Sequence, residues 1–401
     1  MTKIILKRGR DESLRRFHPW VFSGAISQIV GEPAEGDIVG VFSQEGEFLA
    51  YGHYQVGSIA VRILSFSGED VLGPDYWVNM VSRALNVRVS AGLARGGGST
   101  NCYRLVHGEG DGLPGLIIDY YDGVCVLQAH SVGMFRAKGA ICDALKKVYG
   151  DSLKAVYDKS SGTAPFKAGL ELVDGYLYKA PGFSDDEQVV LENSNKFYVN
   201  WTEGQKTGFF LDQRDNRALV GKYSSGRNVL NLFCYTGGFS VYALAAGAVH
   251  CDSVDSSKKA IEMVERNIAL NGFDPFLHTG YCTDAIDFLR DVPEDKYDLI
   301  IVDPPAFAKH RGVLNNALRA YQRLNAAAIS KVAPGGLVFT FSCSQVVDKE
   351  AFALAVFSAA AQTGRSVRIL DRLNQPADHG VNIYHPEGED LKGLLLYVEG
   401  K

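Results

Sequence analysis

Hydrophobic and polar residues alternate with one periodicity up to about residue 70 and with a different one after about residue 197. In the first part, short runs of alternating apolar residues, such as 37–42 and 58–64, are separated by glycine and glutamate turns. A period of two is typical of strands that bury one face. The first segment therefore predicts a small β-rich barrel or sheet.

The middle of the chain mixes both periods. Apolar residues at helical spacing predict helices over 76–94 and about 134–149, and shorter apolar runs between turn residues predict strands. The predicted strands lie near 103–106, 115–119, 124–128 and 154–157. This mixture predicts a compact α+β central domain.

From about residue 197, continuous apolar runs alternate with amphipathic stretches. Residues 228–233, 299–302 and 337–341 are largely apolar on both faces and predict buried strands. Residues 250–255 predict a further strand, and Ser256-Ser257 directly after it is a helix-capping signal. Strands buried on both faces and alternating with helices predict a parallel, doubly wound α/β sheet. The predicted domains are therefore 1–72, 73–190 and 191–401.

The composition narrows the class of protein. Of the 401 residues, 46% are hydrophobic and 22% are charged, which is typical of globular domains and excludes a disordered chain. No run approaches the roughly 18 apolar residues of a membrane-spanning helix, and the first residues lack the apolar core of a signal peptide. The seven cysteines include no C-x-x-C pair, so we expect no metal site and no disulfides in a reduced, cytoplasmic chain.

The net charge is 41 minus 46, or −5, so any binding of nucleic acid needs a local basic patch. The first 16 residues supply one, with six basic residues against Asp11 and Glu12. Such a run is either a solvated face or an edge that contacts RNA phosphates, and the sequence leaves both interpretations open. The candidate RNA contacts are Lys7, Arg8, Arg10, Arg15 and Arg16.

The turn after the first strand of the C-terminal sheet, residues 233–240, is a candidate cofactor site because ligands of such sheets bind at strand carboxyl ends. It lacks the G-x-G-x-x-G pattern, and Phe233 and Tyr235 stand where a pyrophosphate needs glycine. A dinucleotide is therefore disfavoured. S-adenosylmethionine needs one tight glycine turn, which Gly237 and Gly238 supply.

S-adenosylmethionine also needs an acid at the end of the next strand to bind its ribose. Asp255 lies there, 17 residues after Gly238, although an aspartate at this place can also simply cap the following helix. Asp284, at the next expected strand end, is a candidate for the adenine amino group.

Two further strand ends carry candidate chemistry. One reads Asp303-Pro304-Pro305-Ala306-Phe307, and an acid followed by two prolines and an aromatic is typical of methyltransferases that act on planar nitrogen-containing rings. The other reads Ser342-Cys343-Ser344. Neighbouring strands lie about 4.8 Å apart, so Asp303 and Cys343 are expected to project into one pocket. We interpret the other cysteines as inert packing (Cys125, Cys142, Cys251 and Cys282) or as a structural part of the cofactor turn (Cys234).

Together these residues resemble one family, the bacterial and archaeal ribosomal RNA methyltransferases of the cytosine-C5 type that act on large-subunit RNA. The resemblance covers essentially the whole chain, and its strength lies in six segments that occur in the right order. They are His18-Pro19-Trp20-Val21-Phe22-Ser23-Gly24-Ala25, Asp111-Gly112-Leu113-Pro114-Gly115, Lys206-Thr207-Gly208-Phe209-Phe210-Leu211-Asp212-Gln213-Arg214, Asn231-Leu232-Phe233-Cys234-Tyr235-Thr236-Gly237-Gly238-Phe239, Asp303-Pro304-Pro305 and Phe341-Ser342-Cys343-Ser344.

The resemblance implies an N-terminal PUA domain, an α+β central domain and a C-terminal class I, Rossmann-like methyltransferase domain. It implies S-adenosylmethionine as cofactor and large-subunit ribosomal RNA as partner, and it places 206–214 beside the cofactor. A homodimer is an assembly that the sequence leaves open. The expected cofactor contacts are Asp212, Gln213, Asn231, Phe233, Tyr235, Gly237, Gly238, Asp255, Ser256, Asp284 and Asp303.

The mechanism expected from this family is covalent. A Cys343 thiolate would add to C6 of cytosine and Asp303 would hold the N3 and amino edge. Three alternatives stay open: a guanine-nitrogen methyltransferase, for example at N7, in which Cys343 has no covalent role; a small-molecule methyltransferase, which would not need 190 preceding residues; and a non-catalytic RNA-binding adaptor, which would leave Asp255, Asp303 and Cys343 without a function.

Overall fold

The computed structural model describes residues 2–67, 73–94, 98–308 and 310–400, and the chain forms two compact units. The predicted domain boundary at residue 72 falls in 68–72 and so lies outside the described residues. The first unit comprises Met1–Val190, Val199–Leu211 and Ala377–Gly388, and the second comprises Leu191–Tyr198, Asp212–Pro376 and Glu389–Lys401.

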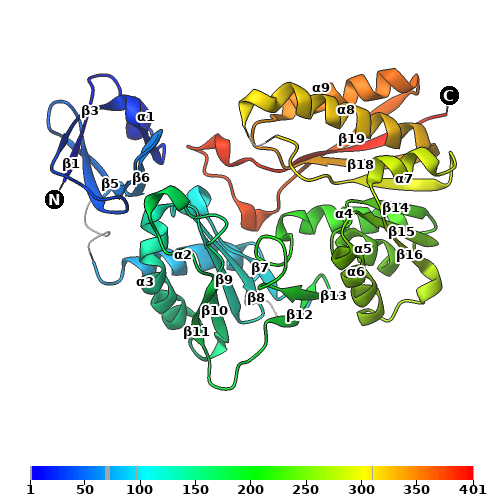
Figure 1. Ribbon diagram of the computed structural model, residues 1–401, viewed down its shortest axis with the longest axis horizontal. Coiled ribbons are helices and arrows are strands. Elements are labelled where there is room, and N and C mark those ends of the chain that lie inside the picture. Colours follow the sequence, from blue (N-terminus) through cyan, green and yellow to red (C-terminus); the bar gives the residue numbers. More distant parts are fainter. Residues whose placement is uncertain (1, 68–72, 95–97, 309, 401) are drawn as a thin grey trace. The chain divides into compact units, whose positions relative to one another are not determined.

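The N-terminal part of the first unit is a six-stranded sheet in the order β2-β6-β5-β4-β1-β3, which confirms the predicted β-rich segment (Figure 1). The pairs are antiparallel except β1 with β4. Ile4 and Leu6 are buried while Lys3 is exposed, as the period of two requires. The elements are β1 (Lys3–Leu6), α1 (Glu12–Arg15), β2 (Trp20–Phe22), β3 (Ile26–Val30), β4 (Ile38–Phe42), β5 (Phe48–Tyr54) and β6 (Ile59–Ser65).

The central part is a five-stranded sheet in the order β11-β10-β9-β8-β7 with two long helices. Helix α2 ends at Ser90, earlier than the predicted residue 94, because Gly92 adopts the left-handed conformation that terminates helices. Ser131 caps α3 by accepting from the Met134 N–H. The elements are α2 (Tyr76–Ser90), β7 (Cys102–His107), β8 (Leu116–Tyr121), β9 (Val124–Ala129), α3 (Val132–Tyr149), β10 (Ala155–Asp158) and β11 (Gly175–Lys179), and a separate hairpin of β12 (Glu187–Glu192) and β13 (Asn195–Asn200) follows.

The second unit contains a seven-stranded sheet in the order β16-β15-β14-β17-β18-β20-β19. The strand order reverses at β14, whose neighbours are β15 and β17, and ligands of such sheets bind at this switch point. The sheet is parallel, as predicted, except at β20, which runs antiparallel to both neighbours because no α-helix joins it to β19. The strands are β14 (Asn228–Leu232), β15 (His250–Asp255), β16 (His278–Cys282), β17 (Tyr297–Val302), β18 (Val332–Ser342), β19 (Val367–Asn374) and β20 (Lys392–Val398).

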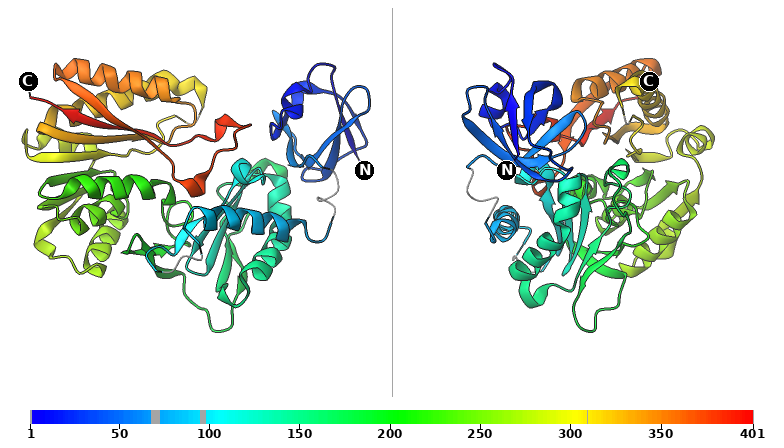
Figure 2. Two further views of the ribbon diagram at one scale, coloured as in Figure 1. Left: turned by 180° about the vertical axis from the view of Figure 1, so that it is seen from behind. Right: turned by 60° about the vertical axis from the view of Figure 1, so that its left-hand side comes forward.

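Helices cover both faces of this sheet (Figures 1 and 2). The central strands are therefore buried on both sides: Ile300 and Ile301 are consecutive in β17 and lie on opposite faces, and both are fully inaccessible to solvent. One face carries α4 (Arg214–Ser224), α5 (Gly238–Ala245) and α6 (Lys258–Leu270), and the other carries α7 (Ala285–Asp291), α8 (Leu314–Lys331) and α9 (Lys349–Thr363). Among the described residues, no helix combines the length and the apolar character needed to cross a membrane.

Candidate active site

The turn between β14 and α5 has an unusual backbone. Phe233 and Tyr235 have φ angles of 57° and 47°, in the left-handed region that costs a residue with a side chain about 1–2 kcal/mol. The Tyr235 N–H donates to Asp255 Oδ2 at 3.0 Å, and the Cys234 N–H donates to the Val254 carbonyl at 3.0 Å. The end of β15 therefore holds the turn in this conformation. Such strain is typical of ligand sites.

Two glycines close the same turn. Gly237 has a φ of 81°, and a Cβ there would lie 2.9 Å from Val264 Cγ1. A Cβ on Gly238 would lie 2.9 Å from the Cδ of Arg217, a buried side chain. Arg217 is fixed in turn, because its Nε and Nη2 each donate at 2.8 Å to the buried Glu192 carboxylate. Neither glycine can be replaced without displacing a packed side chain.

Asp255 is not the N-cap of the following helix. Ser257 is, since its hydroxyl accepts from the Ala260 N–H, while Asp255 Oδ1 accepts from the Ser257 N–H at 2.9 Å. Each carboxylate oxygen of Asp255 thus accepts one backbone N–H, and a carboxylate can accept about four bonds, so two remain for a ligand. The predicted contact Ser256 is exposed between these two residues.

Asp284 lies two residues beyond β16 and is exposed. Its Oδ1 caps α7 by accepting from the N–H groups of Ile286 and Asp287 at 2.8 and 3.1 Å. A helix-capping role is therefore visible for Asp284, and its contact with adenine stays a prediction.

The structure brings Cys343 to the turn that begins at Asp303. In the parallel register of β17 and β18, Val302 lies opposite Thr340, so both strands end at the same edge. The Cys343 Sγ lies 4.0 Å from the Pro304 carbonyl oxygen, within reach of a weak S–H bond. Asp303 and Cys343 are both partly exposed. A ligand that reaches this edge would therefore meet a carboxylate and a thiol together.

The serines on either side of Cys343 fix the loop that carries it. Ser344 is buried, donates to the Ala308 carbonyl at 2.7 Å and accepts from the Ala308 N–H at 3.2 Å. Ser342 donates at 2.9 Å to the hydroxyl of Tyr321, whose pKa is raised to about 12 by burial. Sequence reasoning missed these anchors, because a serine beside a loop cysteine carries no signal of its own.

Three of the four cysteines that we interpreted as packing residues are buried, and so is Cys234 in the cofactor turn. Cys125, Cys142, Cys234 and Cys251 are buried, and burial raises the pKa of each thiol, to about 12 for Cys251, so they stay protonated. The same prediction is wrong for Cys282, which is exposed. It is the last residue of β16, which lies at the sheet edge and has a neighbour on one side only.

The predicted basic edge of the first unit is partly neutralised by its own acids. Arg15 donates to both Asp11 and Glu47 at 2.6 Å, and Arg8 pairs with Glu45 at 3.7 Å on the surface. Lys7 donates to the Gly24 carbonyl at 3.0 Å. Arg10 and Arg16 are exposed, with no ion pair among the described residues. Arg15 is therefore less available to a phosphate than the other four.

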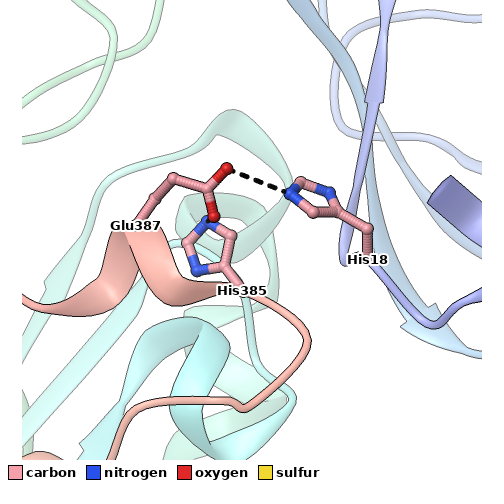
Figure 3. Close-up of side chains that lie close together, drawn as sticks. All are labelled: His18, His385 and Glu387. Atoms are coloured by element: carbon pink, nitrogen blue, oxygen red, sulfur yellow. Dashed lines mark hydrogen bonds and ion pairs between the residues drawn. The ribbon is translucent and has the colours of Figure 1, made fainter.

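A second cluster of ionisable groups lies in the first unit and joins His18 to residues 377–388 (Figure 3). His18 Nε2 lies 3.4 Å from Glu387 Oε1, and His385 Nε2 lies 3.7 Å from Glu387 Oε2. Three such groups are a candidate metal site. However, His18 Nδ1 accepts the Trp20 N–H at 3.2 Å, so the neutral ring carries its proton on Nε2, facing Glu387. The geometry fits a hydrogen bond that docks the segment.

Comparison with known proteins identifies the family. The model of the S-adenosylmethionine-dependent methyltransferase family matches residues 180–396, and that of the PUA-like domain matches residues 4–66. A "Ribosomal RNA large subunit methyltransferase I" from Aeromonas hydrophila is 39% identical over 400 residues, covering 98% of this chain and 99% of its own. A protein of the same name from Pseudoalteromonas atlantica is 40% identical and covers 99% of both chains. The chain belongs to the family of the large-subunit ribosomal RNA methyltransferases I.

Solved structures agree on the fold. A methyltransferase crystallised with S-adenosylhomocysteine (SAH) has a TM-score of 0.85 at 23% identity, over 99% of this chain and all of its own. An S-adenosylmethionine-dependent methyltransferase from Streptococcus mutans has a TM-score of 0.83 at 23% identity, with the same coverage. The class I methyltransferase fold, the PUA-like domain and the cofactor S-adenosylmethionine are therefore as predicted.

The residues around the glycine turn fit this methyltransferase cofactor, which presents an ammonium, an amino group and hydroxyls as donors. Asp212 Oδ1 and Asn231 Oδ1 are buried without a hydrogen-bond partner among the described residues. An unsatisfied buried acceptor costs about 1–3 kcal/mol, which a donor-rich ligand would relieve. Asn231 Nδ2 donates to Ser240, and buried Gln213 accepts from Asn216. Of segment 206–214, the residues from Asp212 onward belong to the second unit.

Asp255→Ala is expected to weaken cofactor binding by about 1.5–3 kcal/mol, roughly 10- to 150-fold, because a charged acceptor is removed and the strained turn is no longer held at Tyr235. Calorimetric titration with S-adenosylmethionine measures this. The matched control is Asp274→Ala, which removes an aspartate that also accepts a backbone N–H, from Phe276, but at the amino end of β16 and away from the carboxyl ends of the strands. An unchanged dissociation constant in Asp255→Ala would remove it from the cofactor site.

Proposed function

We propose that this protein transfers the methyl group of S-adenosylmethionine to C5 of a cytosine in large-subunit ribosomal RNA. The observation that carries the proposal is the convergence of two strand ends, with the Cys343 Sγ 4.0 Å from the Pro304 carbonyl of the Asp303 turn. Burial keeps the thiols of Cys125, Cys142, Cys234 and Cys251 protonated, whereas Cys343 is partly exposed at the ligand edge. The relatives named for large-subunit ribosomal RNA support the class of substrate.

Cytosine C5 is a weak nucleophile within the aromatic ring, so the chain must activate it. Bound S-adenosylmethionine supplies an electrophilic methyl group on a sulfonium. The Cys343 thiolate adds to C6, which breaks the C5–C6 double bond and makes C5 an enamine-like nucleophile. C5 takes the methyl carbon as the bond between that carbon and sulfur breaks, with its electron pair left on S-adenosylhomocysteine. A base then removes the C5 proton, the double bond re-forms and the thiolate leaves C6. The thiolate is therefore regenerated, and one proton is released in each turnover.

Asp303 would orient the base during these steps. Electron density that moves into the ring on addition at C6 favours a proton on N3, and the carboxylate would accept from N3–H and from the amino group. The rigid Pro304-Pro305 sequence after Asp303 fixes the backbone of this turn. A cytosine must leave any base stack to reach the edge of a sheet, so the substrate is a flipped or unpaired nucleotide.

The test is methyl transfer to ribosomal RNA from a strain that lacks this protein, with S-adenosylmethionine carrying a deuterated methyl group. Mass spectrometry of the hydrolysed RNA is expected to find deuterated 5-methylcytidine in the large-subunit fraction. Deuterated methylguanosine would instead establish the guanine-nitrogen alternative. RNA binding without methyl transfer would support the adaptor. The predicted homodimer stays a prediction, which sedimentation of the purified chain tests.

Charge reversal at the basic edge is expected to weaken RNA binding and reduce its dependence on salt. Replacing Arg8, Arg10 and Arg16 by Glu should lower the slope of log K against log salt by about 0.7–0.9 for each phosphate that the variant no longer neutralises. Among single substitutions, Arg15→Glu should change this slope least, because Asp11 and Glu47 already bind the Arg15 guanidinium. Filter binding across a salt series measures both. Arg290→Glu, an exposed and paired arginine of the second unit, is the control. An unchanged slope in the triple variant would mean that the edge is a solvated face.

A further inference from the structure

A buried lysine lies directly behind the loop that carries Cys343. Lys392 is the first residue of β20 and pairs in antiparallel register with Ser342, the residue before the cysteine. Its side chain is 5% exposed, although lysine is almost never fully buried unless it is paired. The covalent mechanism described above does not use it, and its place in the fold therefore needs an explanation.

The ammonium group of Lys392 donates to two main-chain oxygens of this loop. The bond to the Ser344 carbonyl is 2.7 Å and the bond to the Val347 carbonyl is 2.6 Å. Carbonyl oxygens only accept, so these contacts favour the fully protonated side chain. Together with the bonds of Ser344 to Ala308, they hold the residues after Cys343 from both sides.

The same charge lies close enough to act on the thiol electrostatically. Burial lowers the pKa of Lys392, while the negative charge of Asp390, and that of Cys343 when it is a thiolate, act in the opposite direction. The interaction is mutual, so a positive charge at Lys392 stabilises the thiolate of Cys343 over its thiol. Other charged or titratable groups face this pair: Asp348 and Lys349 near Lys392, Tyr321 near Cys343, and Asp303 on the neighbouring strand end.

We infer that Lys392 is a positioning residue for the methyl transfer, which both fixes the shape of the Cys343 loop and supplies the positive charge that favours the reactive thiolate. The inference rests on the proposed function in that Cys343 is taken as the nucleophile. It adds that the activating charge comes from the antiparallel strand beneath the loop.

The test measures the reactivity of Cys343 rather than activity alone. The full-length protein is treated with iodoacetamide across a pH series, and peptide mass spectrometry follows each cysteine separately. In Lys392→Met, alkylation of Cys343 at neutral pH is expected to fall about tenfold, with the midpoint of its pH profile moved up by about one unit. Lys392→Arg keeps the charge and should restore most of the reactivity. Exposed Cys282, in the same tube, should be unaffected.

A matched variant separates the charge from the hydrogen bonds that the substitution removes. Lys331 lies at the opposite end of β18, just before it, and likewise donates to main-chain carbonyls, those of Arg290 and Val292. Lys331→Met should destabilise the fold but leave the Cys343 profile unchanged. If Lys392→Met also leaves that profile unchanged while the variant remains folded, the inference is wrong. If the profile moves but Cys343 forms no adduct with RNA, the inference about the thiol stands and the proposed function fails.

Discussion

Cys343→Ala is expected to abolish methyl transfer, by at least about 10³-fold or roughly 4 kcal/mol in the activation free energy, because the covalent route has no substitute. Binding of S-adenosylmethionine and of RNA should change little, since the glycine turn and the basic edge do not involve this side chain. The thiol is partly exposed and makes a weak contact at 4.0 Å, so the free energy of unfolding should also change little. Single-turnover assays with saturating cofactor and RNA measure the fall in rate.

Trapping gives a second, independent readout for the same residue. RNA with 5-fluorocytosine at the target should remain covalently attached to the wild-type protein, because fluorine cannot leave C5 as a cation. Cys343→Ala should form no such adduct. Cys234→Ala, which removes a buried thiol that stays protonated, should still form it. Methylation by Cys343→Ala at a rate near that of the wild type would exclude the covalent route and favour a guanine-nitrogen target.

The strand ends of the second unit were predictable because they depend on local sequence. Largely apolar runs located β14, β17 and β18 to within a few residues, and the predicted strand 250–255 coincides with β15. The largest difference is at β18, which begins five residues before the predicted strand. Parallel neighbours end at one edge, so the approach of Cys343 to the turn that begins at Asp303 followed once β17 and β18 were taken as adjacent. The direction of β20 could not be predicted, because an apolar run does not show whether its strand is parallel or antiparallel to its neighbours. Only the connection between the strands decides this.

The residues that support the Cys343 loop could not be predicted from the sequence, for a related reason. Lys392, Ser344 and Tyr321 act through hydrogen bonds between segments that are 21 to 48 residues apart in the chain. Their residue types are common, and no spacing rule links them to a cysteine. The pairing of Arg15 with Glu47, 32 residues away in the chain, was likewise not predictable from the sequence. It makes Arg15, one of the predicted phosphate contacts, less available to RNA. Long-range polar contacts of this kind are fixed by tertiary packing and not by local pattern.

Asp303→Ala is expected to lower the rate of methylation by about 100-fold or more, because it removes a charged acceptor for N3–H and for the amino group from a site where charge develops. Asp303→Asn should fall between this variant and the wild type, since an amide oxygen still accepts from the amino group but carries no charge. The rate at which 5-fluorocytosine RNA is trapped should fall in the same order, because trapping also begins with addition at C6.

The control for Asp303 lies on the same strand. Asp298, near the start of β17, accepts from the Asn228 N–H at 2.8 Å and lies at the far end from the site. Asp298→Ala should cost stability but leave the methylation rate per folded molecule unchanged. Calorimetry with S-adenosylmethionine separates two roles of Asp303: if its substitution weakens cofactor binding as much as it lowers the rate, the carboxylate serves the cofactor. If binding is retained and the rate falls, the carboxylate serves the base, because only the base gains charge as Cys343 adds to it.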